Sequence, residues 1–167
     1  MSPIDGCIYV ADSWNNRIQV FDENGVYLKS IDKIDQMEFH YPYSIHIDKK
    51  GRIYVSDQSL LRIKVLDSNF NLIRVIGQYG REIGCYSGLC DISTDKDNNI
   101  FVCDSGNHRI LKFSENGDFI LQWGSNGTAQ GKPFFVQKYL NFQTKLLITN
   151  IKVYSNVLHV SQFMTKK

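Results

Sequence analysis

Ile8-Tyr9-Val10-Ala11-Asp12 recurs in this chain as Ile53-Tyr54-Val55-Ser56-Asp57 and again as Ile100-Phe101-Val102-Cys103-Asp104. The copies start at residues 8, 53 and 100, so they are 45 and 47 residues apart. An Arg-Ile pair begins five residues after each aspartate, at Arg17, Arg62 and Arg109. Short apolar β-runs that recur every 40–50 residues or so are typical of propeller blades. The repeat therefore predicts an all-β propeller.

Each copy belongs to a unit of short strands separated by turn residues. In the second unit we expect strands at 44–48, 52–56, 61–67 and 71–76, and in the third at 91–94, 100–103, 109–114 and 119–123. The first unit continues with expected strands at 17–21 and 26–31, but its innermost strand is missing, because Asp5-Gly6 aligns with the turn Lys50-Gly51. An Asn-Gly pair between alternating apolar runs, as at Asn24-Gly25 and Asn116-Gly117, is a strong hairpin signal.

These units predict the domain organisation. We expect repeats over residues 1–131, with blades at about 1–31, 39–77 and 86–124. Residues 132–167 are interpreted as an insertion and a degenerate partial fourth blade, because 151–162 resembles 45–58. The chain would hold about three and a half four-stranded blades, whereas propellers close as rings of typically four to eight. We therefore expect an incomplete propeller, completed by further blades of the same full-length protein or by another protomer.

Composition limits the class of protein. A hydrophobic fraction of 43% and a charged fraction of 22% are those of a globular protein, and a net charge of +2 creates no general attraction to nucleic acid or membranes. No run approaches the roughly 18 apolar residues of a membrane span, and residues 1–6 do not resemble a secretory signal. We therefore expect a cytoplasmic protein without a membrane partner. No Cys-x-x-Cys pair occurs, so we expect neither a zinc site nor a disulfide framework for Cys7, Cys85, Cys90 and Cys103.

The repeated Val-x-Asp-x-x-x-x-Arg-Ile unit resembles the NHL repeat. The third copy matches best, because Asp104-Ser105-Gly106-Asn107-His108-Arg109-Ile110 contains the Asn-His-Arg-Ile segment of that family. Residues 12–18 are nearly as close, whereas residues 57–63 lack the Asn-His or Asn-Asn pair before the arginine. The markers of WD40 and kelch blades are missing. The resemblance covers residues 4–131 and implies a six-bladed β-propeller similar to the NHL domains of tripartite-motif and RING-finger proteins.

The resemblance implies a non-catalytic scaffold that binds protein partners, in some relatives as the substrate-recognition part of an E3 ubiquitin ligase. A second hypothesis is a single-stranded RNA-binding domain in post-transcriptional regulation. A third is a metal-dependent enzyme of the lyase or lactonase type, because the amidating lyases have a related propeller with a histidine-bound metal. No matching histidine set, Gly-x-Ser-x-Gly motif or phosphate loop can be assigned in these 167 residues, and no RING, B-box or coiled coil occurs in them. We therefore expect no catalysis, no cofactor and no metal.

The candidate binding residues lie in loops. The loops between second and third strands and the loops between blades should share one side of the propeller, here called the loop face. Loops on a rigid scaffold commonly carry binding function. Aromatic side chains mixed with amides and bases can stack unpaired bases or anchor a protein segment, although each residue could equally serve packing alone. The candidates are Trp14, Asn15, Tyr41, Tyr43, Tyr79, Arg81 and His108.

The aspartates and arginines of the repeat end one strand and begin the next, so a hairpin brings each pair within reach. In the structural interpretation the carboxylate accepts N–H groups of the turn and pairs with the arginine. In the functional interpretation the acids ring a central channel and hold a cation. Recurrence in every unit favours the structural interpretation. The pairs are Asp12 with Arg17, Asp57 with Arg62, and Asp104 with Arg109.

Overall fold

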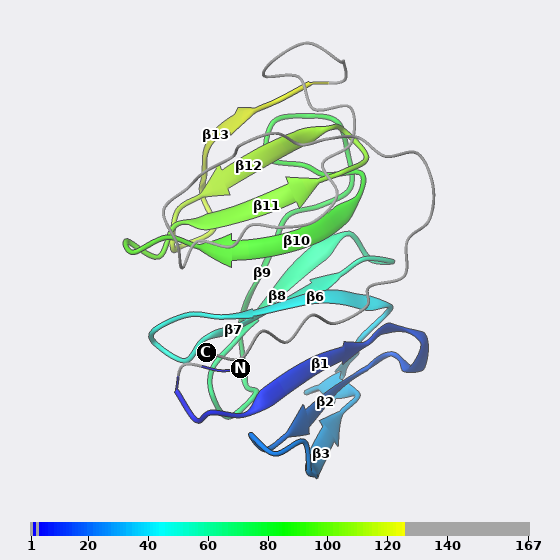
Figure 1. Ribbon diagram of the computed structural model, residues 1–167. Helices are drawn as coiled ribbons and strands as arrows, with labels where there is room; N and C mark the ends of the chain where they lie inside the picture. Colours follow the sequence, from blue (N-terminus) through cyan, green and yellow to red (C-terminus); the bar gives the residue numbers. More distant parts are fainter. Residues whose placement is uncertain (1, 3, 126–167) are drawn as a thin grey trace, which may run out of the picture.

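The computed structural model describes residue 2 and residues 4–125, which form three antiparallel sheets placed side by side as blades (Figure 1). The fold class predicted from the repeats, an incomplete all-β propeller, is confirmed. The first blade contains β1 (Ile8–Asp12), β2 (Arg17–Phe21) and β3 (Tyr27–Ile31). The second contains β6 (Pro42–Ile47), β7 (Ile53–Asp57), β8 (Arg62–Leu66) and β9 (Leu72–Ile76). The third contains β10 (Leu89–Thr94), β11 (Ile100–Asp104), β12 (Arg109–Phe113) and β13 (Phe119–Trp123).

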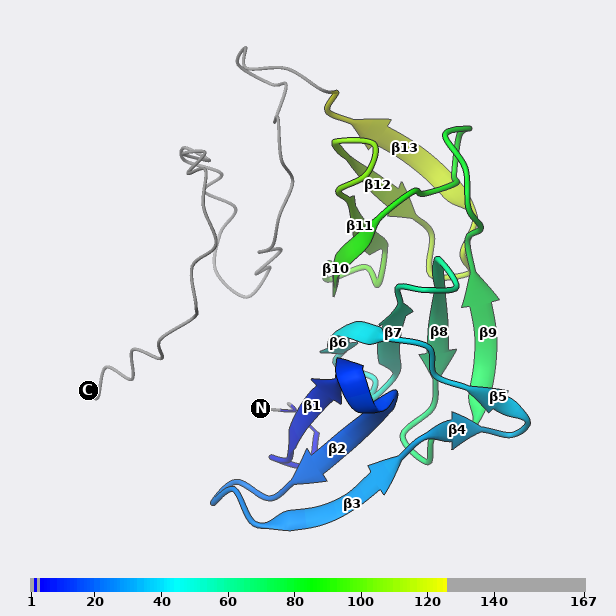
Figure 2. The same cartoon turned by 90° about the vertical axis from the view of Figure 1, so that its right-hand side faces the viewer.

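Strands within each blade follow the order of the sequence, and the innermost strands β6 and β10 contact each other (Figure 2). The strand ends lie within two residues of the predicted ones. The small hairpin of β4 (Lys33–Ile34) and β5 (Met37–Glu38) between the first two blades was not predicted. Its strands are two residues long, too short to leave an alternating pattern in the sequence. The expected partial fourth blade lies outside the described residues.

The apolar core lies between blades. One cluster joins the first and second blades and contains Ile18, Phe39, Ile53 and Val55. A second joins the second and third blades and contains Tyr54, Ile63, Ile100, Leu111 and Phe113, among others. Ile53, Tyr54 and Val55 of β7 alternate between the two clusters, so both faces of this strand are buried.

An aspartate organises each of four hairpin turns in the same way. One oxygen of Asp48, for example, accepts the backbone N–H groups of Lys50 and Arg52, both at 2.9 Å. Such Asx turns satisfy N–H groups that the β-ladder leaves free. The other three turns are built by Asp22, Asp67 and Asp95.

No helix in the described part of the chain is long and apolar enough to cross a membrane.

The interface between the second and third blades gives a first prediction. Gly77 has φ +84°, and an added Cβ would lie 1.7 Å from the hydroxyl of the buried Tyr86, which donates to the carbonyl of Ile76. We expect Gly77→Ala to lower the free energy of unfolding by about 2 kcal/mol or more, measured by urea denaturation. Gly6→Ala is the matched control, because Gly6 has φ +69° and open space around it. Equal losses in the two variants would show that backbone strain alone is responsible.

Candidate functional site

Three aromatic side chains form a row that starts at the loop-face junction of the first and second blades. Trp14, in the 3-10 turn η1 (Ser13–Asn15), is 87% exposed. Its ring meets the ring of Tyr41 edge to face, with centroids 5.6 Å apart, and Tyr41 stacks on Tyr43 at 6.5 Å. Trp14, Tyr41 and Tyr43 are called the aromatic row below. These three sequence-predicted residues come from two blades and meet in the fold.

Hydrogen bonds between the blades fix the aromatic row. The hydroxyl of Ser13 donates to the carbonyl of Pro42 at 2.6 Å, and the N–H of Tyr41 donates to the side-chain oxygen of Asn16 at 2.8 Å. Tyr41 has φ +59°, a left-handed conformation that is uncommon for a residue with a bulky side chain. Such strain persists where the surrounding structure imposes it, and it is often found at functional sites.

A buried ion pair holds the segment that leads into the row. The ammonium of Lys64 lies 2.9 Å from a carboxylate oxygen of Asp57, and both side chains are fully buried. Lys64 also donates to the carbonyl of Glu38 and lies 4.5 Å from the ring centroid of Phe39. The same oxygen of Asp57 accepts the N–H of His40 at 3.2 Å. Burial lowers the pKa of Lys64, because it disfavours the charged ammonium.

The repeat aspartates and arginines pair in two of the three blades. The Nε atom of Arg17 lies 2.8 Å from Asp12, and that of Arg109 lies 3.1 Å from Asp104. In the second blade the expected pair is not formed, because Lys64 binds Asp57. The residue two positions after the arginine accounts for the difference. Only the second blade has a cation there, since the equivalent positions are Gln19, Lys64 and Leu111.

The third blade uses its repeat residues to anchor the loop at 77–88. Arg109 donates to the carbonyls of Glu82 and Cys85 at 3.0 and 2.8 Å. One oxygen of Asp104 accepts the N–H groups of Ser87 and Gly88.

The anchored loop presents two of the remaining candidates. Tyr79 is 74% exposed and Arg81 is also exposed. Within residues 4–125 no ring contact joins Tyr79 to the aromatic row. His108 is half-buried with φ +56°, and Asn15 uses its amide to bind Asp12.

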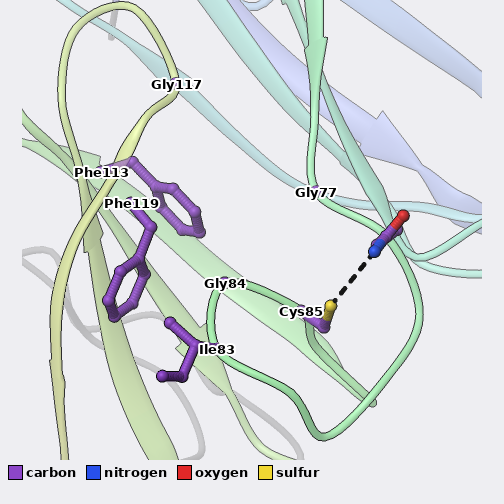
Figure 3. Close-up of a pocket in the computed structure, with 8 residues that line it drawn as sticks. Gly77, Ile83, Gly84, Cys85, Phe113, Gly117 and Phe119 are labelled. Atoms are coloured by element: carbon purple, nitrogen blue, oxygen red, sulfur yellow. Dashed lines mark hydrogen bonds between the residues drawn. The ribbon is translucent and has the colours of Figure 1, made fainter.

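A hollow of about 280 Å³ opens between the segment that follows the second blade and the third blade (Figure 3). Its walls include Ile83, Phe113 and Phe119, and no charged side chain lines it. The amide of Gln78 donates to the sulfur of Cys85 at 3.4 Å. Sequence reasoning missed this hollow, because its walls come from three separate segments of ordinary core and turn residues.

The innermost strands β6 and β10 are joined by side-chain hydrogen bonds. The hydroxyl of Ser44 donates to Asp91 at 2.7 Å, and Nε2 of His46 lies 2.9 Å from the hydroxyl of Thr94. Burial lowers the pKa of His46, although the charges of Asp48 and Asp91 oppose that shift.

The described residues contain no group of three or more His, Cys, Asp or Glu side chains that could hold a metal ion.

Comparison with family models identifies propeller repeats in two parts of the chain. A model described as a 6-bladed beta-propeller matches residues 2–59, and a model described as the NHL repeat matches residues 91–113. The second match falls on the copy that carries the Asn-His-Arg-Ile segment. The NHL resemblance stated from the sequence is therefore confirmed.

Relatives in sequence are similar over part of the chain. Peptidyl-glycine alpha-amidating monooxygenase B of Xenopus laevis is 33% identical over 102 residues, which is 58% of this chain and 12% of that protein. The peptidylglycine alpha-amidating monooxygenase of Rattus norvegicus is 29% identical over 97 residues, or 54% of this chain and 10% of that protein. The matched region thus spans only about a tenth of the length of these relatives.

Solved structures share the fold at low identity. Virginiamycin B lyase of Staphylococcus aureus is 20% identical with a TM-score of 0.57, covering 77% of this chain and 41% of its own. Hydrazine synthase of Kuenenia stuttgartiensis is 13% identical with a TM-score of 0.59, covering 80% and 35%. At these identities the likeness shows a common propeller fold and nothing about activity.

The buried ion pair gives a prediction about stability. Lys64→Met removes the ammonium that binds both the carboxylate of Asp57 and the carbonyl of Glu38, while Arg62 stays opposite Asp57 in the ladder, so we expect a loss of about 1–3 kcal/mol in the free energy of unfolding. The double variant Asp57→Asn with Lys64→Met should regain most of that loss in chemical denaturation. Lys50→Met is the control, because Lys50 pairs with Glu115 at the surface and should change stability little. A Lys64→Met variant as stable as the control would contradict the prediction.

The position of His46 predicts a dependence of stability on pH. The pKa of His46 is lowered in the folded protein, so the unfolded chain binds more protons below its ordinary value of 6.5. The free energy of unfolding should therefore fall as the pH drops from 7.5 to 5.5. His46→Asn should weaken that fall, whereas His40→Asn, at an exposed position, should keep it. Identical pH profiles for the wild type and His46→Asn would refute this role.

Proposed function

Because this chain belongs to the NHL-repeat β-propeller family, we propose that it is an interaction scaffold whose loop face binds a segment of a partner protein. The observation that carries the proposal is the aromatic row, in which the fold holds an exposed Trp14 against Tyr41. Tryptophan and tyrosine dominate the binding energy of protein interfaces, because they bury a large area at a small entropic cost. A tryptophan left 87% exposed on a rigid support suits that role.

The names of the sequence relatives support a peptide as the class of ligand. Both are named for an action on peptidyl-glycine. The same scaffold can bind a peptide without catalysis when its loops carry anchoring groups alone. In a larger protein, such a scaffold would select the partner on which other domains act, as the substrate-recognition part of a ubiquitin ligase does.

Single-stranded RNA is the second candidate, because a row of aromatic rings can also stack bases. Proteins that bind single-stranded RNA without a sequence preference combine such rings with a positively charged groove that follows the phosphates. On this loop face Arg17 and Arg109 are neutralised by Asp12 and Asp104, which leaves Arg62 and the exposed Arg81, two cations in separate loops and too few to follow a run of phosphates. The charge arrangement therefore favours a protein segment over RNA.

Selection from a displayed library of random 12-residue peptides tests the proposal on the full chain. We expect enriched peptides with an aromatic or large apolar residue, and Trp14→Ala should weaken their binding at least tenfold in fluorescence polarisation. Tyr27→Ala is the matched control, because Tyr27 is 54% exposed at the opposite end of the first blade. Failure to enrich any peptide, together with salt-sensitive binding of a random RNA pool, would replace this proposal by the RNA hypothesis.

A further inference from the structure

The second blade leaves one repeat arginine without the partner that its counterparts have. Arg17 and Arg109 are bound to the aspartates opposite them in the ladder. Arg62 lies opposite Asp57 in the same register but makes no ion pair with any residue in the described part of the chain. Its Nε atom is buried and has no hydrogen-bond partner. One oxygen of Asp57 is also buried without one, so the two groups stay apart.

The local balance of charge follows from the pairing of Asp57 with Lys64 instead of Arg62. Asp57 supplies one negative charge, and the fully buried Lys64 neutralises it at 2.9 Å. The charge of Arg62 therefore has no counterion among its described neighbours. An arginine is always protonated in proteins and carries donors in a fixed fork that fits a carboxylate. A partly buried guanidinium without an acceptor is costly in the free protein and gains strongly when an anion binds.

The position of Arg62 connects it with the aromatic row. Arg62 begins β8 at the loop end of the second blade. The loop before it is hydrogen-bonded to the segment that carries Tyr41: the N–H of Gln58 donates to the carbonyl of Tyr41 at 3.1 Å, and the N–H of Ser59 donates to that of His40 at 3.2 Å. The unpaired cation and Tyr41 of the aromatic row therefore belong to the same junction of two blades.

We infer that Arg62 is a carboxylate-binding group of the loop face, and that the site selects peptide segments in which an acidic group lies near an aromatic or apolar anchor. This inference rests on the proposed peptide-binding function and adds the chemistry that the partner must offer. The aromatic row takes the anchor, and the guanidinium of Arg62 donates to the carboxylate. Arg17 occupies the same place in the first blade but cannot serve in this way, because Asp12 already accepts its Nε–H.

Parallel peptide selections on the wild type, Arg62→Gln and Arg17→Gln test the inference. We expect Asp or Glu to be enriched near the anchor on the wild type and on Arg17→Gln, and that enrichment to disappear on Arg62→Gln. In the best peptide, replacing the acidic residue by its amide should weaken binding about tenfold on the wild type and hardly at all on Arg62→Gln. Arg62→Lys should keep part of the preference, because it retains the charge without the fork. Circular dichroism and thermal melting verify that the variants are folded.

The outcomes separate this inference from the function beneath it. Peptides that bind through Trp14 without any acidic preference, or with a preference that survives in Arg62→Gln, overturn the role of Arg62 and leave peptide binding in place. No enriched peptide on the wild type overturns both. Testing the best peptide as a free acid and as a C-terminal amide tells the two sources of a carboxylate apart. Loss of binding only in the amide assigns the chain terminus, and unchanged binding assigns the acidic side chain.

Discussion

A propeller blade needs both of its faces covered by neighbours, and the rest of the architecture depends on that constraint. The strands are apolar on both sides, so a blade on its own would expose two hydrophobic surfaces. In the second blade Val55 packs toward the first blade and Tyr54 toward the third, although the two residues are adjacent in sequence. Full burial of a side chain of this size contributes about 1.5–3 kcal/mol. The sheets are therefore held mainly by their neighbours.

Because packing between blades buries the faces of the sheets, the loops at the strand ends are the parts that remain to bind a partner. The loop-face junction of the first two blades shows how these ends are made rigid. Its backbone groups are satisfied across the interface, as between Ser13 and Pro42 and between Asn16 and Tyr41, and a buried Lys64 fixes the incoming segment. The backbone at such a junction loses little entropy on binding, since the fold has already ordered it. The exposed Trp14 is therefore carried on an ordered backbone.

The fold could be predicted from the sequence because three copies of the repeat contain the same pattern of strand and turn residues. The Asn-Gly turns and the copies of the Ile-x-Val-x-Asp strand each constrain only nearby residues, and local patterns of this kind survive folding unchanged. The site was only partly readable. Spacing placed Trp14 and Tyr41 on one face, but their contact depends on how two blades dock. The exchange of Arg62 for Lys64 as the partner of Asp57 depends on burial, which the periodicity does not encode.

That exchange shows how a repeat protein can vary its surface without altering its fold. Gln19, Lys64 and Leu111 occupy equivalent positions, and each of the three blades keeps the same cross-strand register between its aspartate and its arginine. Gln19 adds a hydrogen bond to an existing ion pair, and Leu111 joins the core beside another. Lys64 instead binds the carboxylate of Asp57. The arginine that pairs with its aspartate in the other two blades is therefore left without an ion pair at the strand end. The residue two positions after the repeat arginine thus decides whether that arginine pairs with its aspartate or is left to bind a ligand.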